Sequence, residues 1–179
     1  MKNRNVILIL VVGLTCSCAT NNLGVLYSVV ECPKNIRERV VSFAQEYVQR
    51  DTLFELGGRD FLEKEGTIEL DCSGLIVMSY QYAVKDTKYS LLFEDTNVSS
   101  LYTYFTIPID IPTPGDLIFM SDNAVFPTHM SIFVGTDNEN IYFIDSTYKE
   151  SDGIDGVTLR YYAKDNPKFL SFARLLVRF

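Results

Sequence analysis

Several residue types are scarce in this chain of 179 residues, which has no tryptophan, one histidine and four cysteines. Basic residues are outnumbered by acidic ones, 16 against 23, so the net charge is −7. No basic stripe remains to neutralise phosphates, which argues against nucleic acid as a partner. The cysteines form neither a C-x-x-C pair nor a metal-ligand spacing, so no metal and no organic cofactor is implied.

The apolar run near the N-terminus is too short to cross a membrane permanently. It covers residues 6–14, whereas a spanning helix needs roughly 20 residues. Lys2 and Arg4 precede the run and small residues follow it, which is the build of an export signal. We therefore interpret residues 1–18 as an export signal and expect one globular domain in the rest of the chain.

The end of this signal resembles a relaxed bacterial lipobox, in which a cysteine after a small residue is lipidated and becomes the mature N-terminus. Cys18 is the expected lipidation site, although Thr15 departs from the leucine that is usual three residues before it. Cys16 is a second option, and cleavage after Ala19 without a lipid is a third. Residues 19–34 would then tether the domain to a membrane of the cell envelope, on its periplasmic or outer face.

The first half of the expected domain has the apolar periodicity of helices. The spacing predicts a helix from about residue 36 to residue 48. A loop follows over residues 51–70, and a second, buried helix is predicted to begin at or next to Cys72. A short third helix is predicted within residues 95–105, before three prolines that force an extended crossing.

The second half changes to short β-branched or aromatic runs separated by turn residues, which predicts strands. Residues 114–116, Pro-Gly-Asp, are interpreted as a structural turn into the first strand. Helices followed by an antiparallel meander predict an α+β domain over residues 35–179. Five strands are expected, over residues 117–120, 130–134, 141–144, 157–161 and 169–177.

A cysteine at the start of a helix is positioned for nucleophilic chemistry. Cys72 would meet unpaired N–H groups and the positive end of the helix dipole, which both favour a thiolate. Such a nucleophile also needs a base that a third polar group holds in one orientation. His129 is the only histidine, so it is the candidate base. Cys32, in a loop before Pro33, is interpreted as a residue without a function of its own.

The orienting group can be placed by strand pairing. If the strand that begins at His129 turns at residues 135–140 and returns through residues 141–144, Asp145 ends the return strand near the imidazole. A carboxylate there would fix the tautomer of His129 and stabilise its imidazolium form. Cys72, His129 and Asp145 are therefore the candidate catalytic residues.

Three motifs occur in a fixed order: Asp-Cys-Ser-Gly-Leu at residues 71–75, Pro-Gly-Asp-Leu-Ile-Phe at 114–119 and His-Met-Ser-Ile-Phe-Val-Gly at 129–135. Together they resemble the NlpC-type cell-wall endopeptidases, a branch of the papain-like cysteine peptidases. The resemblance implies a papain-like fold with N-terminal helices packed on a five- to six-stranded antiparallel sheet. It also implies hydrolysis of peptide bonds in peptidoglycan stem peptides through a thioester at Cys72, whose backbone N–H would contribute to the oxyanion hole.

Two positions depart from the pattern of that family. Its third catalytic residue is most often a second histidine, where this chain has Asp145. Residues 51–58 resemble a G-T-P-Y-x-x-G-G stretch, but Phe54 replaces a tyrosine that lies by the active site in the family. The change at Phe54 leaves open an amidase or acyltransferase of the same superfamily. A non-catalytic envelope lipoprotein on this fold is the remaining alternative.

Overall fold

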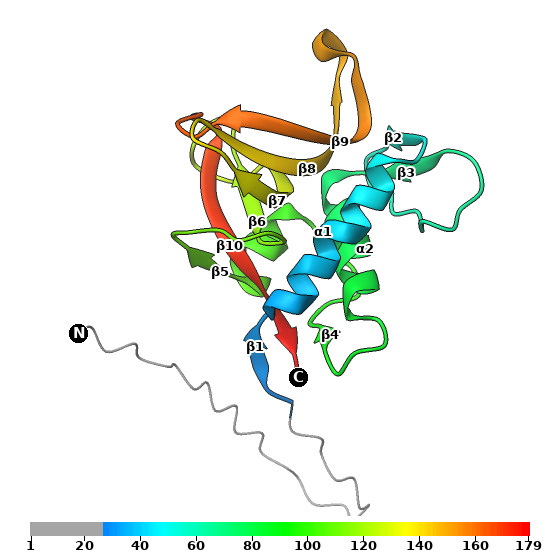
Figure 1. The fold of residues 1–179 in the computed structure, drawn as a ribbon, viewed down its shortest axis with the longest axis vertical. Coiled ribbons are helices and arrows are strands. Elements are labelled where there is room, and N and C mark those ends of the chain that lie inside the picture. The colour runs from blue at the N-terminus through cyan, green and yellow to red at the C-terminus, as the bar shows by residue number, and fades with distance from the viewer. Residues whose placement is uncertain (1–26) are drawn as a thin grey trace, which may run out of the picture.

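In the computed structural model, which describes residues 27–179, two long helices have the apolar periodicity that the sequence predicts. α1 (Lys34–Val48) buries Ile36, Val40 and Ala44 along one face, at helical spacing. α2 (Cys72–Val84) is buried on nearly every side, because α1 covers part of it and the sheet covers the rest. Figure 1 shows both helices on the same side of the sheet.

The strands form an antiparallel sheet whose main path is β1-β10-β6-β7-β8-β9, and two further strands, β4 and β5, pair with β10. A separate parallel pair, β2 (Thr52–Phe54) and β3 (Ile68–Leu70), precedes α2. Figure 1 shows how strongly the sheet twists between β10 and the β8–β9 hairpin. The strands of the large sheet are β1 (Val29–Glu31), β4 (Ser90–Leu91), β5 (Thr106–Ile109), β6 (Leu117–Met120), β7 (His129–Thr136), β8 (Asn140–Lys149), β9 (Ile154–Ala163) and β10 (Phe169–Arg178).

The predicted α+β class is confirmed, and both long helices and all five predicted strands are present. The sheet has more strands than expected, because β1 and β4 are too short to show an alternating pattern and β5 contains Pro108, which weakens the signal of a strand. β1 lies within residues 19–34, the expected tether, and β2 and β3 lie within the expected loop at residues 51–70. The meander ends at β9, since β10 returns to pair with β6. The third helix is α3 (Val98–Ser100), which continues as a π-helix, η1 (Leu101–Phe105).

Apolar side chains cover both faces of the central strands. Leu117 and Phe119 of β6 belong to the large core that includes both helices. Ile118 and Met120 alternate with them and belong to a second, smaller core on the other face. Burial of such a side chain contributes roughly 1.5–3 kcal/mol to folding. The strands that carry the candidate site are therefore held from both sides.

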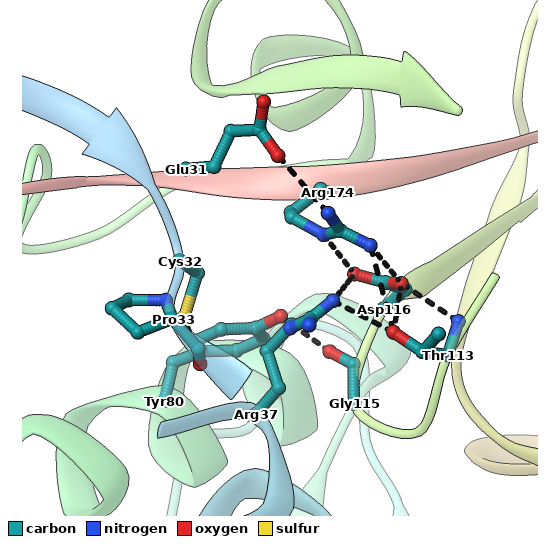
Figure 2. A network of polar contacts seen from close by, with 9 residues as sticks. All are labelled: Glu31, Cys32, Pro33, Arg37, Tyr80, Thr113, Gly115, Asp116 and Arg174. Carbon is teal, nitrogen blue, oxygen red and sulfur yellow. Dashed lines mark hydrogen bonds and ion pairs between the residues drawn. The ribbon is translucent and has the colours of Figure 1, made fainter. Parts of the chain in front are cut away.

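A buried ion-pair cluster connects α1, β6 and β10, and Figure 2 shows its members around Asp116. Asp116 is fully buried, and its carboxylate accepts hydrogen bonds from Arg37 at 2.8 Å and from Arg174 at 2.9 and 3.0 Å. It also accepts the backbone N–H of Thr113 at 2.8 Å, which agrees with a structural turn at residues 114–116. Gly115 has a φ of +85°, and a Cβ there would lie 2.2 Å from the Arg37 carbonyl oxygen. This cluster fixes the turn that leads into β6.

Cys32 lies beside this cluster and is 1% exposed (Figure 2). Burial raises the pKa of its thiol to about 12, and the opposing effect of Arg37 is smaller. The thiol is therefore protonated at neutral pH, which fits the interpretation that Cys32 has no chemical function. Cys32 and Cys72 are both free cysteines.

Candidate active site

Cys72 is the first residue of α2, and the side chain of Asp71 caps that helix. One carboxylate oxygen of Asp71 accepts the N–H of Gly74 at 2.6 Å and the hydroxyl of Ser73 at 2.8 Å. The other oxygen accepts the N–H of Gly57 at 2.8 Å. These bonds fix the first turn of the helix, where unpaired N–H groups and the helix dipole favour negative charge on the sulfur.

Two glycines allow the chain before α2 to pack against its first turn. A Cβ on Gly74 would lie 2.0 Å from the carbonyl oxygen of Gly58, which is too close for any side chain. That oxygen also accepts the N–H of Asp71 at 3.2 Å. A Cβ on Gly58 would lie 2.8 Å from the backbone of Glu69. Both glycines are therefore required for the position of Cys72.

His129 is the first residue of β7 and lies opposite Met120 of β6. Its Nε2 is 2.6 Å from Oδ2 of Asp145, which leaves Nδ1 for the neighbouring thiol of Cys72. Burial disfavours the protonated imidazole, but hydrogen bonds with Asp145 and Cys72 outweigh burial and raise the pKa of His129 to about 9. The imidazole is therefore protonated at neutral pH.

Asp145 is completely buried and accepts hydrogen bonds from two cationic side chains. Burial alone would raise its pKa, but the hydrogen bonds from His129 and Arg160 outweigh burial and lower it. The sequence predicts that Asp145 ends its strand, and this is wrong, because β8 stays paired with β9 as far as Lys149. The side chain nevertheless lies against His129, as strand pairing predicts.

Ser146 connects the strand of Asp145 to the segment that carries Cys72. Its buried hydroxyl donates to the carbonyl oxygen of Leu70 at 2.6 Å. Leu70 is the last residue of β3 and stands two residues before Cys72. This hydrogen bond therefore helps to set the distance between the thiol and the imidazole. Sequence reasoning missed it, because a serine within a strand is not by itself a signal.

Arg160 of β9 also belongs to the site and was missed by sequence reasoning. Its Nε donates to Oδ1 of Asp145 at 2.9 Å, and its Nη2 donates to Oδ2 of the same carboxylate. Its side chain is 10% exposed. The available signal was a charged residue among the apolar and aromatic residues of a strand, since an arginine there needs a buried partner.

Two cavities border the residues of the site. One, of about 520 Å³, is lined by Asp71 and Ser73, the neighbours of Cys72, together with Arg59. The other, of about 300 Å³, is lined by His129 and Arg160. Across residues 27–179, no group of three His, Cys, Asp or Glu side chains is placed to hold a metal ion.

Phe54 ends β2, opposite Leu70 of β3, and its backbone N–H donates to Asp155 at 2.9 Å. The position where relatives carry a tyrosine therefore adjoins the segment that leads into Cys72. A phenyl ring brings no hydroxyl to it, so any polar contact with a substrate would have to come from another residue.

Comparison with known proteins supports the resemblance that the three motifs suggest. The model of the NlpC/P60 family matches residues 51–167, well over half of the chain. The match begins at the residue before β2 and continues past the end of β9, so it contains Cys72, His129, Asp145 and Arg160. No curated protein matches the chain.

Proposed function

The chain belongs to the NlpC/P60 family, whose members hydrolyse the cell wall, and from this premise we propose that it is a cysteine peptidase acting on peptidoglycan stem peptides. The observation that carries the proposal is the hydrogen bond between buried Asp145 and His129, with Cys72 as the neighbour of that imidazole at the start of α2. The same order of carboxylate, imidazole and nucleophile is used for acyl transfer on several unrelated folds.

The charge states support Cys72 as the nucleophile. With a pKa of about 9, His129 is an imidazolium at neutral pH, and it lies next to the sulfur. A cation beside the sulfur and the start of α2 both favour the thiolate. The pair would then hold a nucleophile and a proton donor together before the substrate arrives.

In the proposed reaction, the Cys72 thiolate attacks the carbonyl carbon of the peptide bond and forms a tetrahedral intermediate. The N–H of Cys72, which has no acceptor within the helix, would donate to the oxyanion. His129 then gives its proton to the leaving nitrogen, the C–N bond breaks, and an amine and a thioester result. Water attacks the thioester while His129 takes a proton from it, which releases the acid and restores the thiolate.

An amidase or acyltransferase of the same superfamily is the second candidate, and Phe54 is the observation that favours it. Such an enzyme would form the same thioester at Cys72 but differ in its substrate or in the acceptor that resolves the thioester. The missing hydroxyl at Phe54 is the difference that would alter how an acyl group or acceptor is held.

We also propose that the protein is exported and lipid-anchored through Cys18 to a membrane of the cell envelope. The N-terminal pattern supports this, but residues 1–26, with Cys16 and Cys18, lie outside the described residues. Within residues 27–179, no helix has the length and apolar character needed to cross a membrane. Incorporation of labelled palmitate into the wild type but not into Cys18→Ala would support the anchor. Equal labelling of both would indicate that Cys16, rather than Cys18, carries the lipid.

The decisive test uses purified sacculi incubated with the full chain or with Cys72→Ala. Hydrolysis of stem peptides would release new amine termini, and mass spectrometry of the fragments would identify the bond. The wild type should release them and Cys72→Ala should not. Fragments joined to an added amine acceptor would favour the acyltransferase. No new termini with an unreactive Cys72 thiol would favour a non-catalytic lipoprotein.

A further inference from the structure

Arg160 and His129 both bind the carboxylate of Asp145. In the β8–β9 hairpin Arg160 pairs with Phe143, and Asp145 pairs with Thr158, so the guanidinium reaches diagonally across the ladder. Its Nε and Nη2 donate to the two oxygens of the carboxylate, and Nη1 lies 3.3 Å from the hydroxyl of Tyr162. Arginine is suited to this position because its planar fork matches the geometry of a carboxylate.

Aromatic rings fix the guanidinium itself. Its central carbon lies 5.3 Å from the ring centre of Phe143 and 5.5 Å from that of Tyr162. Burial opposes the charge of Arg160, but the hydrogen bonds to Asp145 outweigh burial and raise its pKa, so the cation persists at every working pH. Arg160 is therefore a fixed positive charge in a fixed place.

The geometry of the carboxylate shows what this contact does. Oδ2 of Asp145 is shared between His129 and Arg160, whereas Oδ1 is bound by Arg160. The terminal torsion of an aspartate is intrinsically broad, so a single bond to the imidazole would not define the plane of the carboxylate. The two-point contact with Arg160 defines it and aims Oδ2 at Nε2 of His129.

We propose that Arg160 is a positioning residue for the proposed reaction: it orients Asp145 toward His129 and partly offsets the charge of that aspartate. The inference rests on the proposed function. The first effect keeps the imidazole directed at Cys72. The second limits how strongly Asp145 retains the proton of His129, which must leave for the nitrogen of the departing amine.

Other charged groups around His129 define the electrostatic background. Cys72 approaches from α2, and Asp122 follows β6 and adds a weak negative influence. The charged residues that line the same cavity as His129 are Asp122, Lys149, Arg160 and Lys168. Lys149 and Lys168 are paired with Asp152 and Asp122, so Arg160 is the cation of this group that binds the Asp145 carboxylate together with His129.

The test uses the fact that His129 is the only histidine, so NMR titration of a tag-free full chain reports its pKa directly. Arg160→Met removes both the fork and the charge, and Arg160→Lys keeps the charge alone. Arg174→Met is the matched control, because it removes one arginine from the other buried aspartate. Each variant is also assayed for kcat/KM on sacculus-derived peptides between pH 6 and 10, after circular dichroism has verified its fold.

Loss of the charge in Arg160→Met should raise the pKa of His129 above its wild-type value by about half a unit to one unit. Its kcat/KM at neutral pH should fall about 10- to 100-fold, the usual scale for a group that orients a catalytic partner. Arg160→Lys should restore the pKa but not the full rate. Arg174→Met should change neither.

Wild-type values of both quantities in Arg160→Met would overturn the inference. So would equal losses of rate in both Arg160 variants with no change in the His129 pKa, since that is the result of a purely structural role. If Arg160→Met does not fold, Arg160→Lys decides: a lower rate at an unchanged pKa supports positioning, and a wild-type rate refutes it. An inactive wild type would refute the proposed function, while the titration would still show whether Arg160 acts on His129.

Discussion

Asp116 and Asp145 are both fully buried, and arginine side chains bind both carboxylates. The two carboxylates differ in their second basic partner. Asp116 is bound by two arginines, whose charges never change, whereas Asp145 is bound by one arginine and by His129, which can release a proton. Burial and ion pairing therefore give a cluster of fixed charge around Asp116, whereas the pair at Asp145 includes a group that can exchange a proton, as the proposed reaction requires.

Each region also contains one free cysteine: Cys32 lies beside the Asp116 cluster, and Cys72 lies beside His129. Cys32 belongs to the buried core beside the Asp116 cluster, and burial raises the pKa of its thiol to about 12. Cys72 is partly exposed at the start of a helix and lies beside an imidazolium. Local surroundings, rather than the residue type, decide which thiol is reactive.

The largest expected difference separates these two cysteines. Cys72→Ala should reduce hydrolysis of sacculi by about 10⁴-fold or more, because the proposed thioester cannot form without the thiol. Cys32→Ala should keep the wild-type rate and lower the free energy of unfolding by about 1–2 kcal/mol, since it leaves a small cavity. Peptide release and urea unfolding of both variants measure these effects. Equal activity of wild type and Cys72→Ala would show that Cys72 is not the nucleophile and does not differ from Cys32 in this respect.

The next largest difference separates the two aspartates. Asp145→Asn should lower kcat/KM by about 10²- to 10⁴-fold and bring the pKa of His129 down from about 9, because the neutral amide no longer stabilises the imidazolium. Asp116→Asn should cost about 3–5 kcal/mol in unfolding free energy, since buried Arg37 and partly buried Arg174 lose their shared counter-ion. Its rate per folded molecule should stay within about threefold of wild type. A large loss of rate in folded Asp116→Asn would show that this cluster also acts on the catalytic groups.

Both regions should lose stability in acid, but the region around Asp145 should also lose stability at alkaline pH, through His129. The folded pKa of His129, about 9, lies above its ordinary value of 6.5, so the stability it contributes is complete below pH 6.5 and is lost as pH rises through 9. The loss should reach up to about 3 kcal/mol. The pKa of Asp116 is lowered, as is that of Asp145, so the contribution of each carboxylate to stability is lost in acid.

Urea unfolding between pH 6 and 9 measures the alkaline effect, and His129→Gln is the control. This variant should show a flat profile in that range, because Cys32 begins to contribute only when unfolded thiols ionise, at about pH 9. A wild-type profile in His129→Gln would assign the alkaline loss to another group.

Long periodic segments of this fold are predictable from the sequence, whereas contacts between segments mostly are not. Cys72 and His129 could be found because one begins a strongly apolar helix and the other is the only histidine. Arg160 could not, since it reaches Asp145 only through the exact register of the β8–β9 hairpin. A slip of one residue would turn it to the other face, and the intervening turn does not define the register. The partners of Asp116 are harder still to predict, because Arg37 and Arg174 lie on elements that are remote from Asp116 in sequence.

The smallest expected effect concerns Ser146, whose hydroxyl binds the Leu70 carbonyl oxygen and joins the Asp145 strand to the segment before Cys72. Ser146→Ala leaves that buried oxygen without this donor, which should cost about 1–3 kcal/mol in stability and several-fold in kcat/KM. Ser79 provides the control, because its buried hydroxyl has no hydrogen-bond partner within residues 27–179. Ser79→Ala should therefore be nearly neutral in both urea unfolding and peptide release. If Ser146→Ala lost stability but kept its full rate, the bond would be a structural joint like the Asp116 cluster. A loss of rate larger than the loss of stability explains would place Ser146 with the catalytic region.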